Sequence, residues 1–154
     1  MNESKDAACI DRSAILPLID RSTLLVAEKA ANLQLEKDSR FRQPAVPCRA
    51  VRTTTTDDCR VRLALYAGEQ TMHRIADGML GGPAMDAEEF EEAVKEFFNV
   101  LCGHIVSEAA RRYHASIFFP PPDFPQDPAC PPENGALCMS FAGASGEHLC
   151  IVCE

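Results

Sequence analysis

The most regular alternation of hydrophobic and polar positions lies in residues 85–112, which predict one long amphipathic helix. At about 100° per residue, with Glu96 at the origin, the apolar side chains fill a sector from about 100° to 220°. Glu92, Glu96, Asn99 and Gly103 fall between about 300° and 360°, so burial of the apolar side turns these four residues toward solvent. The apolar set is Phe90, Val94, Phe97, Phe98, Leu101, Ile105 and Ala109.

Two further features of this helix concern its start and its exposed side. Asp86 is placed to cap the first turn, and Glu89 follows three residues later, where an acid suits the helix dipole. Gly103 is unusual, because a glycine inside a helix costs about 1 kcal/mol relative to alanine. On the exposed side it gains nothing in packing, so one physical use for it is to let another surface approach closely.

Weaker patterns predict the other elements, and the resulting order is αβββααβββ. Two more helices are expected over residues 15–32, with Pro17 in the first turn, and over residues 68–80, ended by Gly81-Gly82-Pro83. Strands are expected over residues 33–36, 50–55, 59–66, 116–119, 137–141 and 148–153, with a turn at Asp57-Asp58 and the last two strands forming a hairpin. Runs of strands and runs of helices favour the α+β class, a mostly antiparallel sheet with long helices packed on it.

The chain is expected to be a single domain over residues 1–154, with residues 1–12 irregular or disordered. Residues 120–134 stand out because this segment contains seven of the eleven prolines. Proline is excluded from helix interiors and central strands, so an extended loop is expected here. A stiff connector is favoured over a polyproline ligand for a partner, and the sequence assigns the loop no role.

Charge and hydropathy narrow the classes of partner. The formal net charge of −8 argues against nucleic-acid phosphates and anionic membrane surfaces as partners. The sequence contains no apolar run near the ~20 residues of a spanning helix, and its start lacks the pattern of a signal peptide. We therefore expect a cytoplasmic protein.

Eight cysteines raise the question of a thiol or zinc site. Cys150 and Cys153 form a CxxC with His148 two residues before it, but residues three apart on a strand point to opposite faces. Since no second CxxC supplies further ligands, two strand cysteines are the favoured interpretation and no metal site is expected. A thiol or zinc protein working through these three residues remains an alternative.

Glu96-x-x-Asn99 on a long helix beside a mostly antiparallel sheet resembles the CheC/CheX/FliY family of bacterial chemotaxis phosphatases, and CheX-like members most closely. The family pattern is Asp or Ser, three residues, Glu, two residues, Asn, then twenty-two residues and Pro. Glu96 and Asn99 match it, and Pro122 stands at the expected distance. Glu92 occupies the first position, where the family has Asp or Ser. The likeness spans roughly residues 53–153, and one such site is found, as in CheX-like proteins.

This resemblance implies hydrolysis of the phospho-aspartate on a CheY-like response regulator of two-component signalling. Asn99 would hold the attacking water, since a carboxamide both accepts and donates hydrogen bonds and does not titrate near pH 7. Glu96 would form a salt bridge to a lysine of the regulator, and Glu92, Gly103 and Pro122 would border the contact. The resemblance also implies a homodimer, and a Mg²⁺ supplied by the regulator, with no cofactor of the chain's own. The alternative is a non-catalytic CheC-like adaptor that binds a signalling protein through the same helix face.

Overall fold

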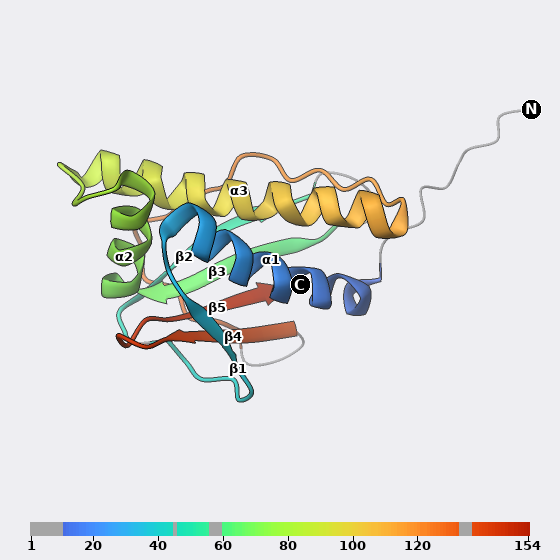
Figure 1. Cartoon of the computed structure of the whole chain (residues 1–154), viewed down its shortest axis with the longest axis horizontal. Helices are drawn as coiled ribbons and strands as arrows, with labels where there is room; N and C mark the ends of the chain where they lie inside the picture. Colours follow the sequence, from blue (N-terminus) through green and yellow to red (C-terminus); the bar gives the residue numbers. More distant parts are fainter. Residues whose placement is uncertain (1–10, 45, 56–59, 133–136) are drawn as a thin grey trace, which may run out of the picture.

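The computed structural model describes residues 11–44, 46–55, 60–132 and 137–154 (Figure 1). The chain forms three helices and five strands in the order αβββααββ. The helices are α1 (Arg12–Ala31), α2 (Glu69–Leu80) and α3 (Ala87–Tyr113). The strands are β1 (Leu35–Asp38), β2 (Cys48–Thr54), β3 (Arg62–Gly68), β4 (Leu137–Gly143) and β5 (His148–Cys153).

The strands form one antiparallel sheet in the order β1-β4-β5-β3-β2. β4 and β5 form the predicted closing hairpin, with Leu137 opposite Cys153 and Ala142 opposite His148. All three helices lie on the same side of this sheet (Figure 1). The predicted α+β class, an antiparallel sheet with long helices packed on it, is therefore confirmed.

The hydrophobic core lies between the sheet and the helices, because alternate strand residues point to the helical side. Leu63, Leu65 and Ala67 follow this rule on β3, and Leu149, Ile151 and Cys153 follow it on β5. The helices also contact one another closely. A Cβ on Gly78 of α2 would lie 1.8 Å from the carbonyl oxygen of Ala31, so only glycine permits this crossing at the end of α1.

Loops cover the opposite side of the sheet. The amide of Ala129 donates to the carbonyl of Cys48 at 2.8 Å, and the amide of Arg42 donates to the Ser140 hydroxyl at 3.2 Å. Pro44 and Pro131 are buried. The proline-rich segment is irregular where it is described, as expected. Its packing on the sheet suits the predicted stiff connector.

Several expectations on element bounds are corrected. Residues 116–119 are not a strand, and this part of the chain makes one isolated bridge, between Arg52 and Asp123. α1 begins at Arg12 with Asp11 as its cap, so residue 12 is helical rather than irregular, and residues 1–10 of that expected segment lie outside the described residues. Pro17 consequently lies in the second turn rather than the first. The turn predicted at residues 57–58 lies outside the described residues.

Candidate functional site

α3 begins and ends where its sequence indicates. The Asp86 carboxylate accepts the amide hydrogen of Glu89 at 2.8 Å, which confirms the predicted cap. Acids occupy the first turn, and Arg111 and Arg112 occupy the last, as the helix dipole favours. The helix ends at His114, whose φ of 51° is left-handed. These capping and charge preferences set the bounds of a helix of 27 residues.

The buried side of α3 is the predicted one. Its seven apolar residues are all buried, and six of them are fully inaccessible to solvent. Phe97 and Phe98 are among the largest fully buried side chains of the protein. On the flank toward α1, the His104 ring bonds the Ser22 hydroxyl at 2.8 Å. Burial of this side therefore sets the rotation of α3 about its axis and turns the opposite side outward.

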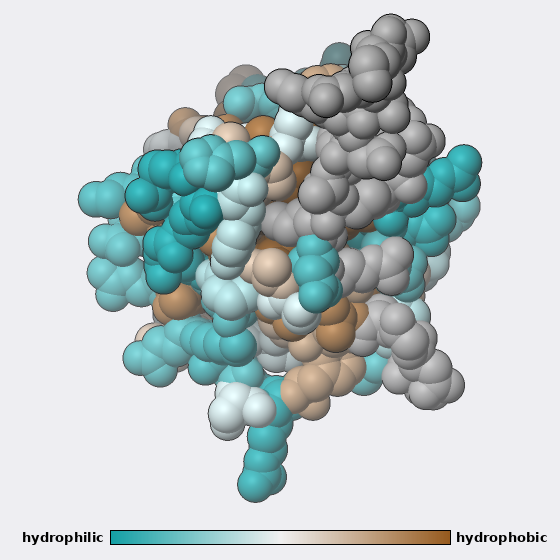
Figure 2. Space-filling model, turned by 90° about the vertical axis from the view of Figure 1, so that its right-hand side faces the viewer, coloured by the Kyte–Doolittle hydropathy of each residue, from teal (hydrophilic) through white to brown (hydrophobic). Residues whose placement is uncertain are grey.

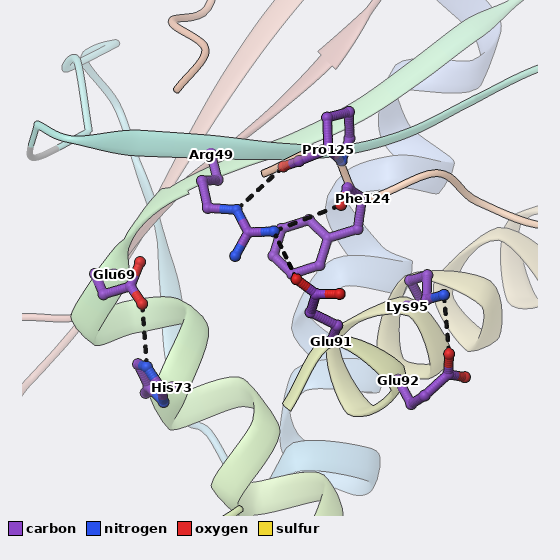
Figure 3. A network of polar contacts seen from close by, with 8 residues as sticks. All are labelled: Arg49, Glu69, His73, Glu91, Glu92, Lys95, Phe124 and Pro125. Atoms are coloured by element: carbon purple, nitrogen blue, oxygen red, sulfur yellow. Dashed lines mark hydrogen bonds and ion pairs between the residues drawn. The ribbon is translucent and has the colours of Figure 1, made fainter. Parts of the chain in front are cut away.

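The opposite side carries Glu92, Glu96, Asn99 and Gly103, all of them exposed, and we call these four residues the docking face. Glu92 is paired, since its carboxylate lies 2.9 Å from the Lys95 ammonium (Figure 3). Among the described residues, no hydrogen bond or ion pair engages the side chain of Glu96 or Asn99. A Cβ on Gly103 would meet no atom within 4 Å, so nothing in the described part of the chain requires glycine there.

Pro122 lies in the segment that leaves α3 and returns alongside it (Figure 1). This segment is attached to the outer edge of β2. Arg52 and Asp123 exchange two backbone hydrogen bonds of 2.9 and 2.8 Å, and the Thr53 hydroxyl donates to the Pro120 carbonyl at 2.8 Å. Pro122 is half-buried next to the first of these contacts.

The length of the segment indicates which part of α3 it passes. The 22 steps from Tyr113 back to Glu91 span about 33 Å of helix at about 1.5 Å each. The eleven steps from Tyr113 forward to Phe124 span at most about 36–40 Å of extended chain. Residue 124 lies near Glu91, because Arg49 contacts both. The return path is thus nearly fully extended, and residues 120–122 pass α3 at about the level of residues 95–99.

The candidate CxxC lies on β5, with its two thiols on opposite faces as predicted. Cys153 belongs to the core under the helices, whereas the Cys150 thiol contacts the Ser140 hydroxyl (3.5 Å) and the Arg42 carbonyl (3.3 Å) on the loop-covered side. Burial raises the pKa of Cys150. Burial likewise lowers the pKa of His148 below its usual 6.5, and the charge of Arg42 adds to this effect. Within the described ranges, no group of three or more His, Cys, Asp or Glu residues is arranged to hold a metal ion.

Arg49 was not predicted from the sequence as a site residue. It lies on β2 and contacts Glu91 as well as the loop backbone near Phe124. Its signal was weak, because an arginine at one position of a half-buried strand normally faces water. The two remaining cysteines with strong shifts are inert core residues. Burial raises the pKa of both Cys48 and Cys102 to about 12, which keeps each thiol protonated.

The fold and the exposed polar face define a class: an α+β domain in which one long helix presents a Glu-x-x-Asn pair above an antiparallel sheet. Chemotaxis proteins are among the solved structures that are similar to this chain. CheX from Desulfovibrio desulfuricans superposes with a TM-score of 0.75 at 13% identity, covering 92% of this chain and 98% of that one. CheX from Vibrio vulnificus gives 0.72 at 17% identity, covering 94% and 99%.

A third similar structure is a complex of CheX with CheY, BeF3 and Mg²⁺ from Borrelia burgdorferi, with a TM-score of 0.64, 14% identity and coverage of 90% and 95%. No family model matches the sequence, and no curated protein sequence matches it. The resemblance to CheX-like proteins is thus confirmed in structure, and the chain has their fold. No helix in the described part of the chain is long and apolar enough to cross a membrane.

Proposed function

We propose that this protein is a phosphatase that hydrolyses the phospho-aspartate of a CheY-like response regulator. The observation that carries the proposal is the state of Glu96 and Asn99. Both are exposed on a helix held from behind by buried phenylalanines, and neither side chain has a partner among the described residues. Polar groups left unpaired on a rigid surface are available to another protein. The similarity to a CheX crystallised with CheY supports a response regulator as that protein.

The mechanism assigns one task to each residue. An acyl phosphate is already reactive, so its hydrolysis depends mainly on placing a water in line with the leaving carboxylate. Asn99 performs this placement, with its oxygen accepting from the water and its NH₂ group donating. Glu96, about one turn away, forms a salt bridge to a lysine of the regulator and fixes the register of the helix.

The remaining parts of the contact follow from the docking face. Gly103 lets the regulator approach the helix closely, and Glu92 and Pro122 border the contact. Mg²⁺ belongs to the regulator, and this chain supplies no cofactor. The proposal includes a cytoplasmic homodimer joined through its sheets. β1 offers an edge for such a contact, since among the described strands it pairs with β4 alone.

The test is the release of phosphate from a response regulator charged with acetyl phosphate. Added in substoichiometric amounts, the wild-type protein should accelerate release well beyond the regulator's own rate, and turnover should require the regulator's Mg²⁺. A protein that binds the phosphorylated regulator without accelerating release would be the CheC-like adaptor instead. A regulator that is neither bound nor dephosphorylated would contradict both functions.

A further inference from the structure

Arg49 is nearly enclosed between three parts of the fold. Its side chain is only 14% exposed, although it stands on β2, the last strand of the sheet. Its Nε donates to the Pro125 carbonyl at 3.1 Å, and its Nη2 lies 3.5 Å from the Phe124 carbonyl. The same Nη2 lies 3.4 Å from the Glu91 carboxylate on α3 (Figure 3). One guanidinium therefore joins β2, α3 and the returning segment.

Stacking adds to these polar contacts. The guanidinium carbon lies 3.8 Å from the centre of the Phe124 ring, within the range of a cation–π contact. Phe124 is buried and packs at 6.1 Å from Phe90 of α3. Phe90 in turn stacks on His73 of α2 at 4.1 Å. The returning segment is thus attached to the helical layer at one point through an aromatic ring and two backbone carbonyls.

We propose that Arg49 is a positioning residue for the phosphatase site, an inference that rests on the proposed function. By holding residues 124–125 against α3, Arg49 keeps residues 120–122 as a stiff wall beside Glu96 and Asn99. The wall is stiff in itself, because three successive prolines fix three φ angles. The contacts of Arg49 with residues 124–125 therefore decide where residues 120–122 lie relative to α3. A regulator that docks on α3 therefore contacts residues 120–122 at a fixed distance from the side-chain amide of Asn99.

The chemistry of the attachment requires arginine. A planar fork can donate to two carbonyls and a carboxylate while its face stacks on a ring. A lysine at the same position would keep the charge opposite Glu91 but would lose the fork and the flat face. Arg49→Lys should therefore retain part of the attachment, and Arg49→Met should lose its polar part while keeping an apolar stem.

Amide hydrogen exchange tests the attachment without reference to activity. The amide of Asp123 donates to the Arg52 carbonyl at 2.8 Å and reports whether the segment is held on β2. In Arg49→Met it should exchange at least about 10-fold faster than in the wild type, whereas the amides of β5 keep their rates. Unchanged exchange at Asp123 would overturn the attachment.

Kinetics and affinity test the link to the site. With phosphorylated regulator as substrate, Arg49→Met should raise KM about 5-fold and leave kcat within about twofold, because Asn99 and its helix are unchanged. Simple loss of folded protein would instead lower apparent kcat at constant KM. The matched control is Arg111→Met, which removes the same charge from an exposed ion pair about 18 Å along α3 from Asn99. It should change neither parameter.

The two readouts separate the possible failures. Faster exchange at Asp123 with unchanged KM and unchanged Kd for the regulator would overturn the role in docking. If the wild type binds the regulator without turnover, the phosphatase proposal fails, and the Kd of Arg49→Met, expected to rise about 5-fold, still tests the wall. If Arg49→Met does not fold, Arg49→Lys takes its place, with a rise in KM of at least about twofold expected and an unchanged KM overturning the inference.

Discussion

Two polar regions of the molecule differ in how their side chains are partnered. Next to α2, the buried carboxylate of Glu147 accepts from the Arg74 guanidinium and from the amide of Ser145, both at 3.0 Å. The Thr71 hydroxyl accepts the amide hydrogen of His148 at 3.2 Å. On α3, the carboxylate of Glu96 and the amide of Asn99 face solvent with no partner among the described residues. The first region stabilises the fold, and the second is available to another molecule.

Stability and function can therefore be changed separately by substitutions in these two regions. Substitutions in the region around Glu147, which we call the hairpin cluster, should change the free energy of unfolding and leave the activity of the folded molecules unchanged. The cluster consists of Thr71, Arg74, Ser145 and Glu147. Substitutions of Glu96 and Asn99 should do the reverse.

The largest expected change in stability is in the hairpin cluster. Glu147→Ala removes a charged acceptor that is 7% exposed and leaves the Ser145 amide without it. We expect the free energy of unfolding to fall by about 2 kcal/mol, as for loss of charge-assisted hydrogen bonds. Urea unfolding measures this change. A variant as stable as the wild type, or one whose folded fraction has lost its phosphatase activity, would contradict the comparison.

The next effect is on affinity at the docking face. Glu96→Ala removes the proposed partner of the regulator's lysine, and we expect the Kd for the regulator to rise about 5- to 10-fold, with slower turnover below saturation. The melting temperature should stay within about 1 °C of the wild type, since the carboxylate has no partner in its own chain. Glu28→Ala, which removes an exposed charge from α1, serves as the control in the same titration. Equal affinity of all three proteins would remove the docking role of Glu96.

A smaller effect with two opposite signs is expected at Gly103. Gly103→Ala should raise the free energy of unfolding by up to about 1 kcal/mol, because alanine is the better helix former and its Cβ meets no atom within 4 Å. The same methyl group should weaken regulator binding, and Gly103→Gln should weaken it more. If the larger side chains bind as well as glycine, close approach at this position is not required.

The smallest effect is the pH dependence contributed by His148. Its folded-state pKa lies below the usual 6.5, so between the two values the unfolded chain binds more protons than the folded one. The contribution of His148 is therefore neutral above about pH 6.5 and becomes destabilising as the pH falls through the folded-state pKa. Unfolding free energies at pH 8 and pH 5 should differ more in the wild type than in His148→Gln. Equal differences would exclude this contribution.

The sequence predicted those helices and strands whose local hydrophobic pattern reflects packing against a single neighbour. The apolar stripe of α3 could be predicted because Phe97, Leu101 and Ile105 all face a single core. The hairpin of β4 and β5 could be predicted because two β-prone runs flank a glycine-containing turn. In each case local periodicity and burial agree, so the orientation of Glu96 and Asn99 followed from the sequence.

The sequence did not predict contacts that join segments far apart in the chain. Residues 116–119 alternate like a strand, with Ile117 and Phe119 buried and Phe118 66% exposed, but the bridge of Arg52 with Asp123 gives this segment only a single ladder contact. Arg49 could not be predicted to meet Phe124, because the two residues lie 75 positions apart. Such pairings depend on the path of the whole chain rather than on a local pattern.

The central claim is that the amide of Asn99 positions the water that attacks a phosphoryl group held by another protein. Its most direct test is the rate of phosphate release by Asn99→Ala at saturating phosphorylated regulator, with Kd and melting temperature measured on the same sample. We expect the rate to fall at least about 100-fold, as when one preorganised catalytic group is removed, with Kd changed less than about threefold. A rate equal to that of the wild type, with the regulator bound equally well, would contradict the account.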